Sequence, residues 1–316
     1  MKLLLIVNPQ ASAVTDKRRK AAERALGEGH DLTVVETLYR GHAIDLARDG
    51  AASGAQVVVV LGGDGTLNEV ANGLVGTDAA LAALPGGSTN VFARTIGTAR
   101  KVKKAAVQVR DAVDRPPRRV GLGLVNGRYF LFHVGMGFDA AVVAKVEQKP
   151  QLKRRIGQAV FVYAAFATWF RGFDRRRPHL VVKQDDKTLV DDGYFAICLN
   201  TNPYTYLGVR PLNVAPDAGF DQPLVLVTLR TIQLGRFLRL VGSTLSSGRR
   251  LREDPEVDYR PNVEAVTVAA WPGDDGDGPG GTENHPFPYQ ADGDYLGEAE
   301  ALSITYEPDR LLLVMP

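Results

Sequence analysis

Residues 61–70 read LGGDGTLNEV, and four consecutive valines precede them. The unbroken apolar run Val57–Leu61 is typical of a parallel strand that is covered on both faces. The apolar residues after the glycines recur at the i, i+3, i+4, i+7 spacing of one helix face: Leu67, Val70, Ala71 and Leu74. The segment therefore predicts a buried strand, a glycine-rich turn and a helix, which is a repeating unit of α/β domains.

The same alternation surrounds this segment. Further strands are expected at Leu3–Val7, Thr33–Thr37 and Leu81–Leu84, and helices at Lys17–Leu26 and 42–49. The pattern predicts a doubly wound α/β nucleotide-binding domain over residues 1–119, ending near a Pro-Pro pair. The C-terminal strand within 303–316 is expected to join it.

Residues 120–302 show a different pattern and predict a larger, antiparallel β-rich domain. Short apolar runs are separated by turn-rich loops, and two helices interrupt them at about 157–171 and 232–246. The expected strands are Tyr129–Val134, Leu180–Val182, Tyr194–Leu199, Leu224–Leu229 and Val263–Trp271. The predicted fold class is thus α/β plus mainly β.

Composition excludes several classes of protein. The chain has 316 residues, a formal net charge of +2 and one cysteine, Cys198. One cysteine excludes a disulfide framework and a cysteine-based zinc site, and the balanced charge gives no reason to expect nucleic acid as a partner. The apolar run at the N-terminus is too short for a signal peptide, and Ala159–Phe170 is too short to span a membrane, so a cytoplasmic protein is expected.

The glycine turn combines features that suit a phosphate ligand. Glycines permit positive φ and let a phosphate approach the backbone, while the helix N-terminus supplies N–H groups and partial positive charge. Asp64 would repel a phosphate unless Mg²⁺ lies between them, directly or through water. Thr66 could cap the helix or donate to the phosphate. The alternative is an ordinary strand-to-helix turn in which Asp64 is a helix cap.

Gly62-Gly63-Asp64-Gly65-Thr66 resembles the nucleotide-binding signature of the diacylglycerol kinase catalytic family, the sphingosine kinases and the NAD kinases. Further segments resemble the bacterial lipid kinases, in order along the chain: Val7-Asn8-Pro9, Thr37 with Gly41-His42-Ala43, Leu84–Arg94, Gly135–Ala140, Tyr289–Asp294 and Pro308–Pro316. Since the match spans nearly the whole chain, the resemblance is to a bacterial lipid kinase, with a proline-glycine turn like that of actinobacterial members.

The resemblance implies an ATP site with Mg²⁺. The residues that would line the nucleotide are Asn8, Pro9, Thr37, Gly62, Gly63, Asp64, Gly65, Thr66, Leu67, Asn68, Ser88 and Asn90. Asp64 is also the expected magnesium carboxylate. Turn or cap chemistry is the alternative for Thr37 and Ser88.

The family places its catalytic base in an Asp-Gly-Glu turn, which corresponds here to Asp292, Gly293 and Asp294. Phosphoryl transfer needs a group that takes the proton of the acceptor hydroxyl, so Asp292 and Asp294 are the expected catalytic carboxylates. The alternative is a solvated acidic turn, because Asp-Gly is a common turn pair.

The sequence departs from the family at several positions. Asp294 is shorter than the usual glutamate by about an ångström, and Val91 and Gly121 stand where many members carry aspartates. The loop at 215–224 resembles a structural-metal loop that would use Gly219, Gln222 and Leu224. Gln222 and Pro223 replace its usual final residues, which weighs against a metal there.

Charge is unevenly distributed along the chain. Residues 145–177 include nine basic and two acidic residues, and residues 253–300 include thirteen acidic and one basic. The basic stretch brackets an aromatic segment, which suits an anionic membrane surface, although a core helix with solvated ends is equally consistent with it. Peripheral association with the inner face of the membrane is expected, and an exposed β edge would allow a homodimer.

These features together predict an ATP-dependent lipid kinase that converts diacylglycerol to phosphatidic acid. Two alternatives remain. A NAD kinase would share only the Gly62–Thr66 turn and is disfavoured by the turns at 85–90 and 292–294. A lipid- or nucleotide-binding homologue with weakened catalysis is suggested by the replaced aspartates.

Overall fold

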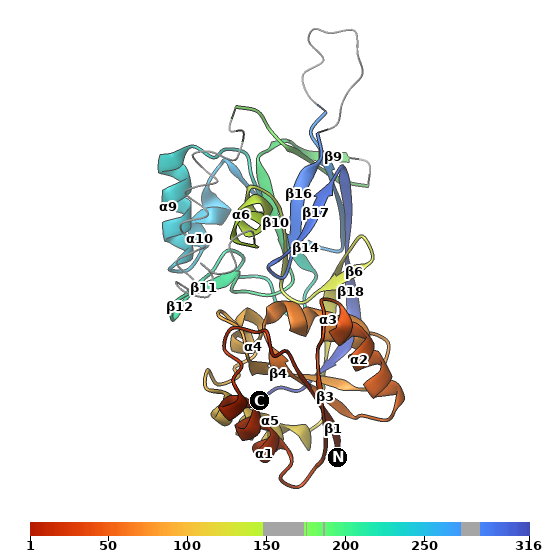
Figure 1. The fold of residues 1–316 in the computed structure, drawn as a ribbon. Helices are drawn as coiled ribbons and strands as arrows, with labels where there is room; N and C mark the ends of the chain where they lie inside the picture. The colour runs from red at the N-terminus through yellow and green to blue at the C-terminus, as the bar shows by residue number, and fades with distance from the viewer. Residues whose placement is uncertain (148–173, 175, 186, 273–284) are drawn as a thin grey trace. The chain divides into compact units, whose positions relative to one another are not determined.

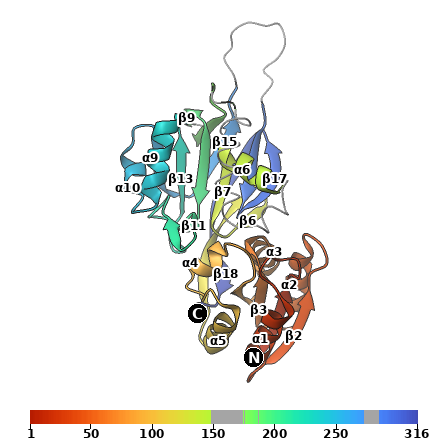
Figure 2. The ribbon, with the colours of Figure 1, turned by 60° about the vertical axis from the view of Figure 1, so that its left-hand side comes forward.

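The computed structural model describes residues 1–147, 174, 176–185, 187–272 and 285–316 and is drawn in Figures 1 and 2. It divides into two compact units, Met1–Leu122 with Glu307–Pro316, and Gly123–Tyr306. The chain passes from one unit to the other within two strands, β5 (Arg118–Val125) and β18 (Ala301–Leu313). The helix expected at 157–171 lies outside the described residues.

A parallel sheet forms the centre of the first unit. Its strands pair in the order β2-β1-β3-β4, and the end of β18 adds to β4, where Leu312 pairs with Ala80. The strands are β1 (Lys2–Val7), β2 (Asp31–Glu36), β3 (Val57–Gly62) and β4 (Ala80–Pro85). All six residues of β3 are buried, as its continuous apolar sequence predicts for a strand covered on both faces.

Helices cover both faces of this sheet. The helices α1 (Asp16–Leu26) and α5 (Val102–Val113) pack on one face with the odd-numbered residues of β1 and β3. The helices α2 (His42–Ala52) and α3 (Asp64–Leu74) pack closely against each other and contact β3. A methyl group at Gly73 would lie 2.3 Å from the carbonyl oxygen of Ile44, so this close approach requires glycine.

Two antiparallel sheets pack face to face in the second unit. The six-stranded sheet has the order β14-β13-β10-β7-β16-β17, and β15, β8 and β9 extend from the first half of β18. The first sheet contains β7 (His133–Gly137), β10 (Phe195–Leu199), β13 (Leu224–Leu229), β14 (Val257–Val263), β16 (Phe287–Ala291) and β17 (Asp294–Ala299). The second contains β8 (Leu180–Gln184), β9 (Lys187–Gly193) and β15 (Ala265–Ala270).

Each face of the six-stranded sheet has its own core. Met136, Cys198 and Leu226 pack against residues of the other sheet such as Val268. The opposite face packs against three helices: α6 (Phe138–Glu147), α9 (Leu234–Thr244) and α10 (Arg249–Glu253). Two short hairpin strands, β11 (Thr205–Leu207) and β12 (Arg210–Leu212), pair with each other. Among the described residues, no helix combines the length and apolar character needed to cross a membrane.

The parallel α/β sheet followed by an antiparallel β-rich unit confirms the predicted fold class. Two expected strands are each divided in the structure. The predicted strand Tyr129–Val134 forms β6 (Arg128–Phe130) and β7, because the backbone bends between them. The predicted strand Val263–Trp271 breaks at Glu264, so β14 and β15 belong to different sheets.

Candidate active site

The carboxyl ends of four neighbouring parallel strands carry most of the predicted nucleotide residues. Asn8 follows β1, Thr37 follows β2, Gly63 follows β3 and the 86–90 turn follows β4. Adjacent parallel strands bring these ends to one edge of the sheet, where ligands bind in open α/β sheets. Direct contacts connect them, since the Gly86 N–H donates to the Gly62 carbonyl at 2.8 Å and the Asn8 N–H donates to the Leu61 carbonyl at 3.0 Å.

The glycines of the two turns pack backbone against backbone. A methyl group at Gly86 would lie 2.7 Å from the Gly62 nitrogen, and one at Gly87 would lie 2.8 Å from the Gly63 Cα. Neither Gly62, Gly63 nor Gly65 has a positive φ. The expectation that these glycines supply left-handed backbone is therefore wrong. Gly86 and Gly87 are needed because any larger residue would separate the two turns.

Asn8 orients the hydroxyl of Thr66 at the start of α3. Its Nδ2 donates to Thr66 Oγ1 at 2.8 Å, and its Oδ1 accepts the N–H of Gln10 at 2.9 Å. Thr66 is buried, and its Cβ would lie only 2.9 Å from a methyl group at Gly62. The hydroxyl is thus held beside the glycine turn by a side chain from the neighbouring strand.

The Asp64 carboxylate caps a helix other than its own. Its oxygens accept the N–H groups of Val91 at 3.0 Å and Phe92 at 3.1 Å, which begin α4 (Val91–Thr95). Negative charge at this position compensates the partial positive charge of a helix N-terminus. Asp64 is half-buried, so it has a capping function and remains partly accessible to solvent.

Glu69 has the same function on the other side of α3. Its buried carboxylate accepts the N–H of Gly41 at 2.9 Å and of Ala43 at 3.3 Å, at the start of α2. Gly41 has no side chain that could cap α2. Glu69 was not among the predicted site residues, although a helix that begins after a glycine and lacks a capping side chain indicates that a distant residue supplies the cap.

The other predicted nucleotide residues differ in accessibility. Pro9 and Ser88 are exposed, whereas Thr37, Leu67 and Asn68 are buried. Asn68 Oδ1 accepts from Asn72 Nδ2 at 3.3 Å within α3, so Leu67 and Asn68 belong to the interior of the unit.

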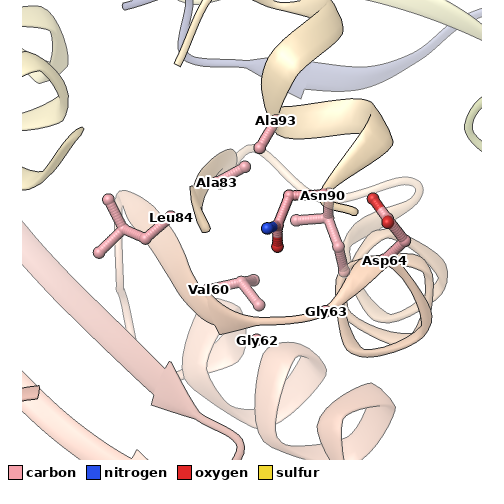
Figure 3. Close-up of a pocket in the computed structure, with 9 residues that line it drawn as sticks. Val60, Gly62, Gly63, Asp64, Ala83, Leu84, Asn90 and Ala93 are labelled. Atoms are coloured by element: carbon pink, nitrogen blue, oxygen red, sulfur yellow. The ribbon is translucent and has the colours of Figure 1, made fainter. Parts of the chain in front are cut away.

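Asn90 closes the second glycine turn on itself. Its Oδ1 accepts the N–H of Gly87 at 2.7 Å and its Nδ2 donates to the carbonyl of Gly87 at 2.8 Å. Its backbone is left-handed, with φ 52°. Figure 3 shows Asn90 beside a small cavity between the glycine turn and α4. At about 10 Å³ this cavity has room for roughly one water molecule, and it is too small for a nucleotide.

The structure gives the Asp292 carboxylate three backbone partners. Its side chain is 2% exposed, and its oxygens accept the N–H groups of Leu131 at 2.7 Å, Phe132 at 2.9 Å and His133 at 3.1 Å. These three amides form the bend that separates β6 from β7. The Asp292 carboxylate therefore holds this bend, and its expected role as a catalytic base stays a prediction.

Asp294 begins β17 and is more accessible. Its side chain is 23% exposed and lies 3.8 Å from an Arg128 guanidinium nitrogen. The turn before it is fixed by Gln290, whose Oε1 accepts the Gly293 N–H at 2.8 Å. The two predicted base candidates thus occupy the same turn, but only Asp294 is partly exposed.

A partly buried polar network adjoins this turn. Gln290 Nε2 donates to Asp139 Oδ2 at 2.8 Å, and the hydroxyl of Tyr204 donates to the other oxygen of Asp139. Burial raises the pKa of Asp139, although the bonds from Tyr204 and Gln290 act in the opposite direction. Burial and the adjacent Asp139 charge raise the pKa of Tyr204 well above its usual value.

His133 packs against this network and stays neutral. The centroid of its ring lies 4.4 Å from the centroid of the Tyr204 ring, and burial lowers the pKa of His133 to about 3. Its Nδ1 has no hydrogen-bond partner within the described part of the chain. His133, Tyr204 and Gln290 were not among the predicted site residues, because their contacts depend on residues far away in the sequence.

The loop at 215–224 offers no carboxylate cage for a metal. The Gln222 N–H donates to the Gly219 carbonyl at 3.1 Å, and Leu224 is the buried first residue of β13. The carboxylate of Asp217 accepts the Tyr259 hydroxyl at 2.6 Å and pairs with Arg252 at 2.9 Å. Within the described ranges, no group of three or more His, Cys, Asp or Glu side chains could hold a metal ion.

Comparison with protein families identifies the first unit. Residues 2–122 match the family model described as the diacylglycerol kinase catalytic domain. This part of the chain is a diacylglycerol kinase catalytic domain. The family resemblance found in the sequence is therefore confirmed, and the match marks the protein as a kinase.

Curated relatives extend the similarity beyond this domain. The chain is 29% identical to a diacylglycerol kinase of Bacillus subtilis over 275 residues, which cover 84% of this chain and 85% of the relative. It is 35% identical to a "Probable lipid kinase YegS-like" of Chromohalobacter salexigens, but over only 50% of each chain. The protein is thus a kinase that is similar to diacylglycerol kinases and to YegS-like lipid kinases.

Solved structures share the whole fold. The crystal structure of a diacylglycerol kinase from Bacillus anthracis strain Sterne aligns with 100% of this chain and 97% of its own, with a TM-score of 0.70 at 19% identity. A second structure from the same strain aligns with a TM-score of 0.75 at 21% identity. Both units therefore occur together in other proteins of this fold.

Proposed function

We propose that the protein transfers the γ-phosphate of ATP to the primary hydroxyl of diacylglycerol and releases phosphatidic acid and ADP. The observation that carries this proposal is the similarity to the Bacillus subtilis diacylglycerol kinase over 84% of the chain, which extends beyond the catalytic domain at residues 2–122. The reaction forms a bond between the acceptor oxygen and the γ-phosphorus and breaks the bond to the ADP oxygen. The acceptor's proton must be taken up by a base.

The first unit would bind the nucleotide at the carboxyl edge of its sheet. The N-terminus of α3, an eleven-residue helix, presents N–H groups and partial positive charge at the Gly62–Asp64 turn. The absence of side chains at Gly63 and Gly87 lets the two turns approach each other backbone to backbone. Asn8 and Thr66 supply a fixed hydroxyl, and exposed Ser88 supplies another, so short polar groups rather than bulk positive charge would receive the phosphates.

Asp64 is the residue that would hold Mg²⁺. Magnesium keeps several waters and is usually bound through one or two carboxylates together with substrate phosphates. A single half-buried carboxylate beside a phosphate turn fits this donor set. Bound there, the ion would neutralise charge on the phosphates, while the chain's own contribution is the Asp64 side chain, which the N–H groups of Val91 and Phe92 orient.

Asp294 is the residue that would accept the proton of the acceptor hydroxyl. Its partial exposure permits contact with a substrate, and the Gln290 contact to Gly293 fixes the turn from which it projects. The proposed mechanism assigns Asp292 no contact with substrate. Asp292 instead holds the bend at 131–133 through its three backbone hydrogen bonds.

A panel of acceptors with γ-labelled ATP and Mg²⁺ tests the proposal. Mixed micelles of dioleoylglycerol should give labelled phosphatidic acid, and sphingosine, phosphatidylglycerol and NAD⁺ should give little product. A labelled product from another lipid would change the assigned acceptor but would still support a lipid kinase activity. ATP binding without turnover at any Mg²⁺ concentration would refute catalysis. We further propose that the protein acts as a peripheral enzyme at the membrane surface, where its acceptor resides.

A further inference from the structure

The helix α9 carries an apolar stripe on its solvent side. Leu234, Leu238 and Val241 of α9 and Leu245, which caps its C-terminus, are 37%, 47%, 37% and 37% exposed. Their spacing of i, i+4, i+7 and i+11 places them within roughly 60° of one another around the helix. They therefore form one continuous strip, which we call the α9 stripe, rather than scattered apolar side chains.

The α9 stripe is separate from the face that holds the helix in the fold. Leu240, Ser243 and Thr244 are buried and face the rest of the unit. In an ordinary surface helix the apolar residues coincide with the buried face and the opposite face is polar. Here Leu240 joins the core while four further apolar residues remain in solvent, which is typical of a surface that contacts something else.

Exposed positive charge without an ion-pair partner in the described chain lies on α9 itself, about 100° around the helix from Leu238, and on α10, which contacts α9. Arg239, Arg249 and Arg250 are exposed, and none of them has an ion-pair partner among the described residues. The arginines around them differ: Arg236 pairs with Asp254 and Glu256, and Arg252 pairs with Asp217. The helix itself contains no acidic residue.

We propose that the α9 stripe and these three arginines form the surface that docks on an anionic lipid bilayer. Interfacial helices bind such membranes through an apolar strip together with basic residues on their other exposed faces. A second copy of this chain would bring the same arginines together across a two-fold interface, where like charges repel. In Figures 1 and 2, α9 lies at the margin of its unit beside α10. The inference rests on the proposed lipid kinase function and names its contact surface.

Flotation of the full-length protein with vesicles tests this surface. The protein should float with phosphatidylcholine vesicles that contain phosphatidylglycerol, bind pure phosphatidylcholine more weakly, and dissociate as salt is raised. Each arginine changed to glutamine should weaken binding about fivefold, and Arg239, Arg249 and Arg250 together about a hundredfold, since one basic residue near the surface contributes about 1 kcal/mol. Leu238→Ser should weaken binding by roughly tenfold.

Matched controls separate this surface from general charge or apolarity. Arg24→Gln removes an exposed arginine of the first unit, and Val209→Ser removes a 68% exposed apolar residue outside α9. Both should bind as the unchanged protein does. Equal losses in these controls, or unchanged binding of the α9 variants, would overturn the proposal. A dimer in sedimentation that Leu238→Ser dissolves would show that a second copy covers the stripe instead.

A kinase assay on short-chain dioctanoylglycerol, without vesicles, distinguishes this inference from the proposed function. The stripe and arginine variants should retain that activity, because each of them changes an exposed residue on or next to α9 or α10. Vesicle binding through α9 without phosphorylation of any lipid would leave the surface standing and refute the kinase proposal. Lipid phosphorylation together with normal vesicle binding by these variants would support the kinase proposal and refute the docking surface.

Discussion

Asp64 in the first unit and Asp292 in the second are both aspartates beside a glycine, and both bind backbone amides of a distant segment. Asp64 accepts two N–H groups and is half-buried, whereas Asp292 accepts three and is 2% exposed. Buried amides need such acceptors, and a charged acceptor makes the stronger bonds. Each aspartate is thus first a part of the scaffold.

The two turns differ in where a group suited to chemistry lies. In the first unit, Asp64 itself is partly exposed, so one residue both caps α4 and faces solvent. In the second unit these tasks are divided, since Asp292 holds the bend and Asp294 is the more accessible carboxylate. Neighbouring acidic residues in one turn can therefore have separate roles, and substitutions can distinguish these roles.

The largest effect is expected from Asp294→Asn. The amide keeps the size of the side chain but cannot accept the acceptor's proton, so turnover should fall by about 10²–10⁴. The free energy of unfolding should change by less than about 0.5 kcal/mol, because the residue is partly exposed. Turnover of labelled phosphatidic acid and urea unfolding measure the two quantities.

Asp185→Asn, an exposed aspartate of the same unit, is the control and should alter neither quantity. Normal turnover in Asp294→Asn would remove Asp294 from the chemistry and end the proposed division of roles within the turn.

Asp292→Asn should act on stability instead. The amide nitrogen would face a backbone N–H donor, and the charge that strengthens all three bonds would be lost, so the free energy of unfolding should fall by about 2–4 kcal/mol. Asp185→Asn again serves as the control, because Asp185 also has a left-handed backbone, with φ 47° against 50° at Asp292. A variant of normal stability that has lost turnover would return Asp292 to a catalytic role.

His133 adds a pH dependence to the segment that Asp292 holds. Its pKa is about 3 in the folded protein against an ordinary value of 6.5, so only the unfolded chain takes up this proton between those values. The contribution of His133 to the free energy of unfolding is fully present above pH 6.5. It is lost as the pH falls, by about 2 kcal/mol between pH 6.5 and 5.

Asp139 acts in the opposite direction, since its raised pKa makes the folded protein hold a proton more readily than the unfolded chain does. The difference between the unchanged protein and His133→Gln isolates the histidine: the variant should lose less stability than the unchanged protein from pH 6.5 to 5. Parallel stability curves would show that His133 is protonated normally in the folded state.

The sequence predicted the strands, the helices and the glycine turn of the first unit because these depend on neighbouring residues. Val57–Leu61 and the helix after it formed as their periodicity indicated. The partners of the turn aspartates could not be predicted, because Asp64 bonds 27 residues along the chain and Asp292 bonds 161 residues away. Local patterns identify an acidic turn, but only the folded chain shows which amides it serves.

Glu69→Gln tests whether capping by α3 matters apart from any chemistry, and its expected effect is the smallest. Glu69 caps α2 as Asp64 caps α4, but it is buried and has no proposed contact with substrate. The glutamine keeps one acceptor and turns a donor toward the other N–H, so stability should fall by about 1–2 kcal/mol. Glu28→Gln, a 72% exposed control, should fall by less than about 0.5 kcal/mol. Equal stability in both variants would show that the start of α2 is held by packing against α3, and the carboxylate caps of the first unit would then be dispensable where the cap of the second is not.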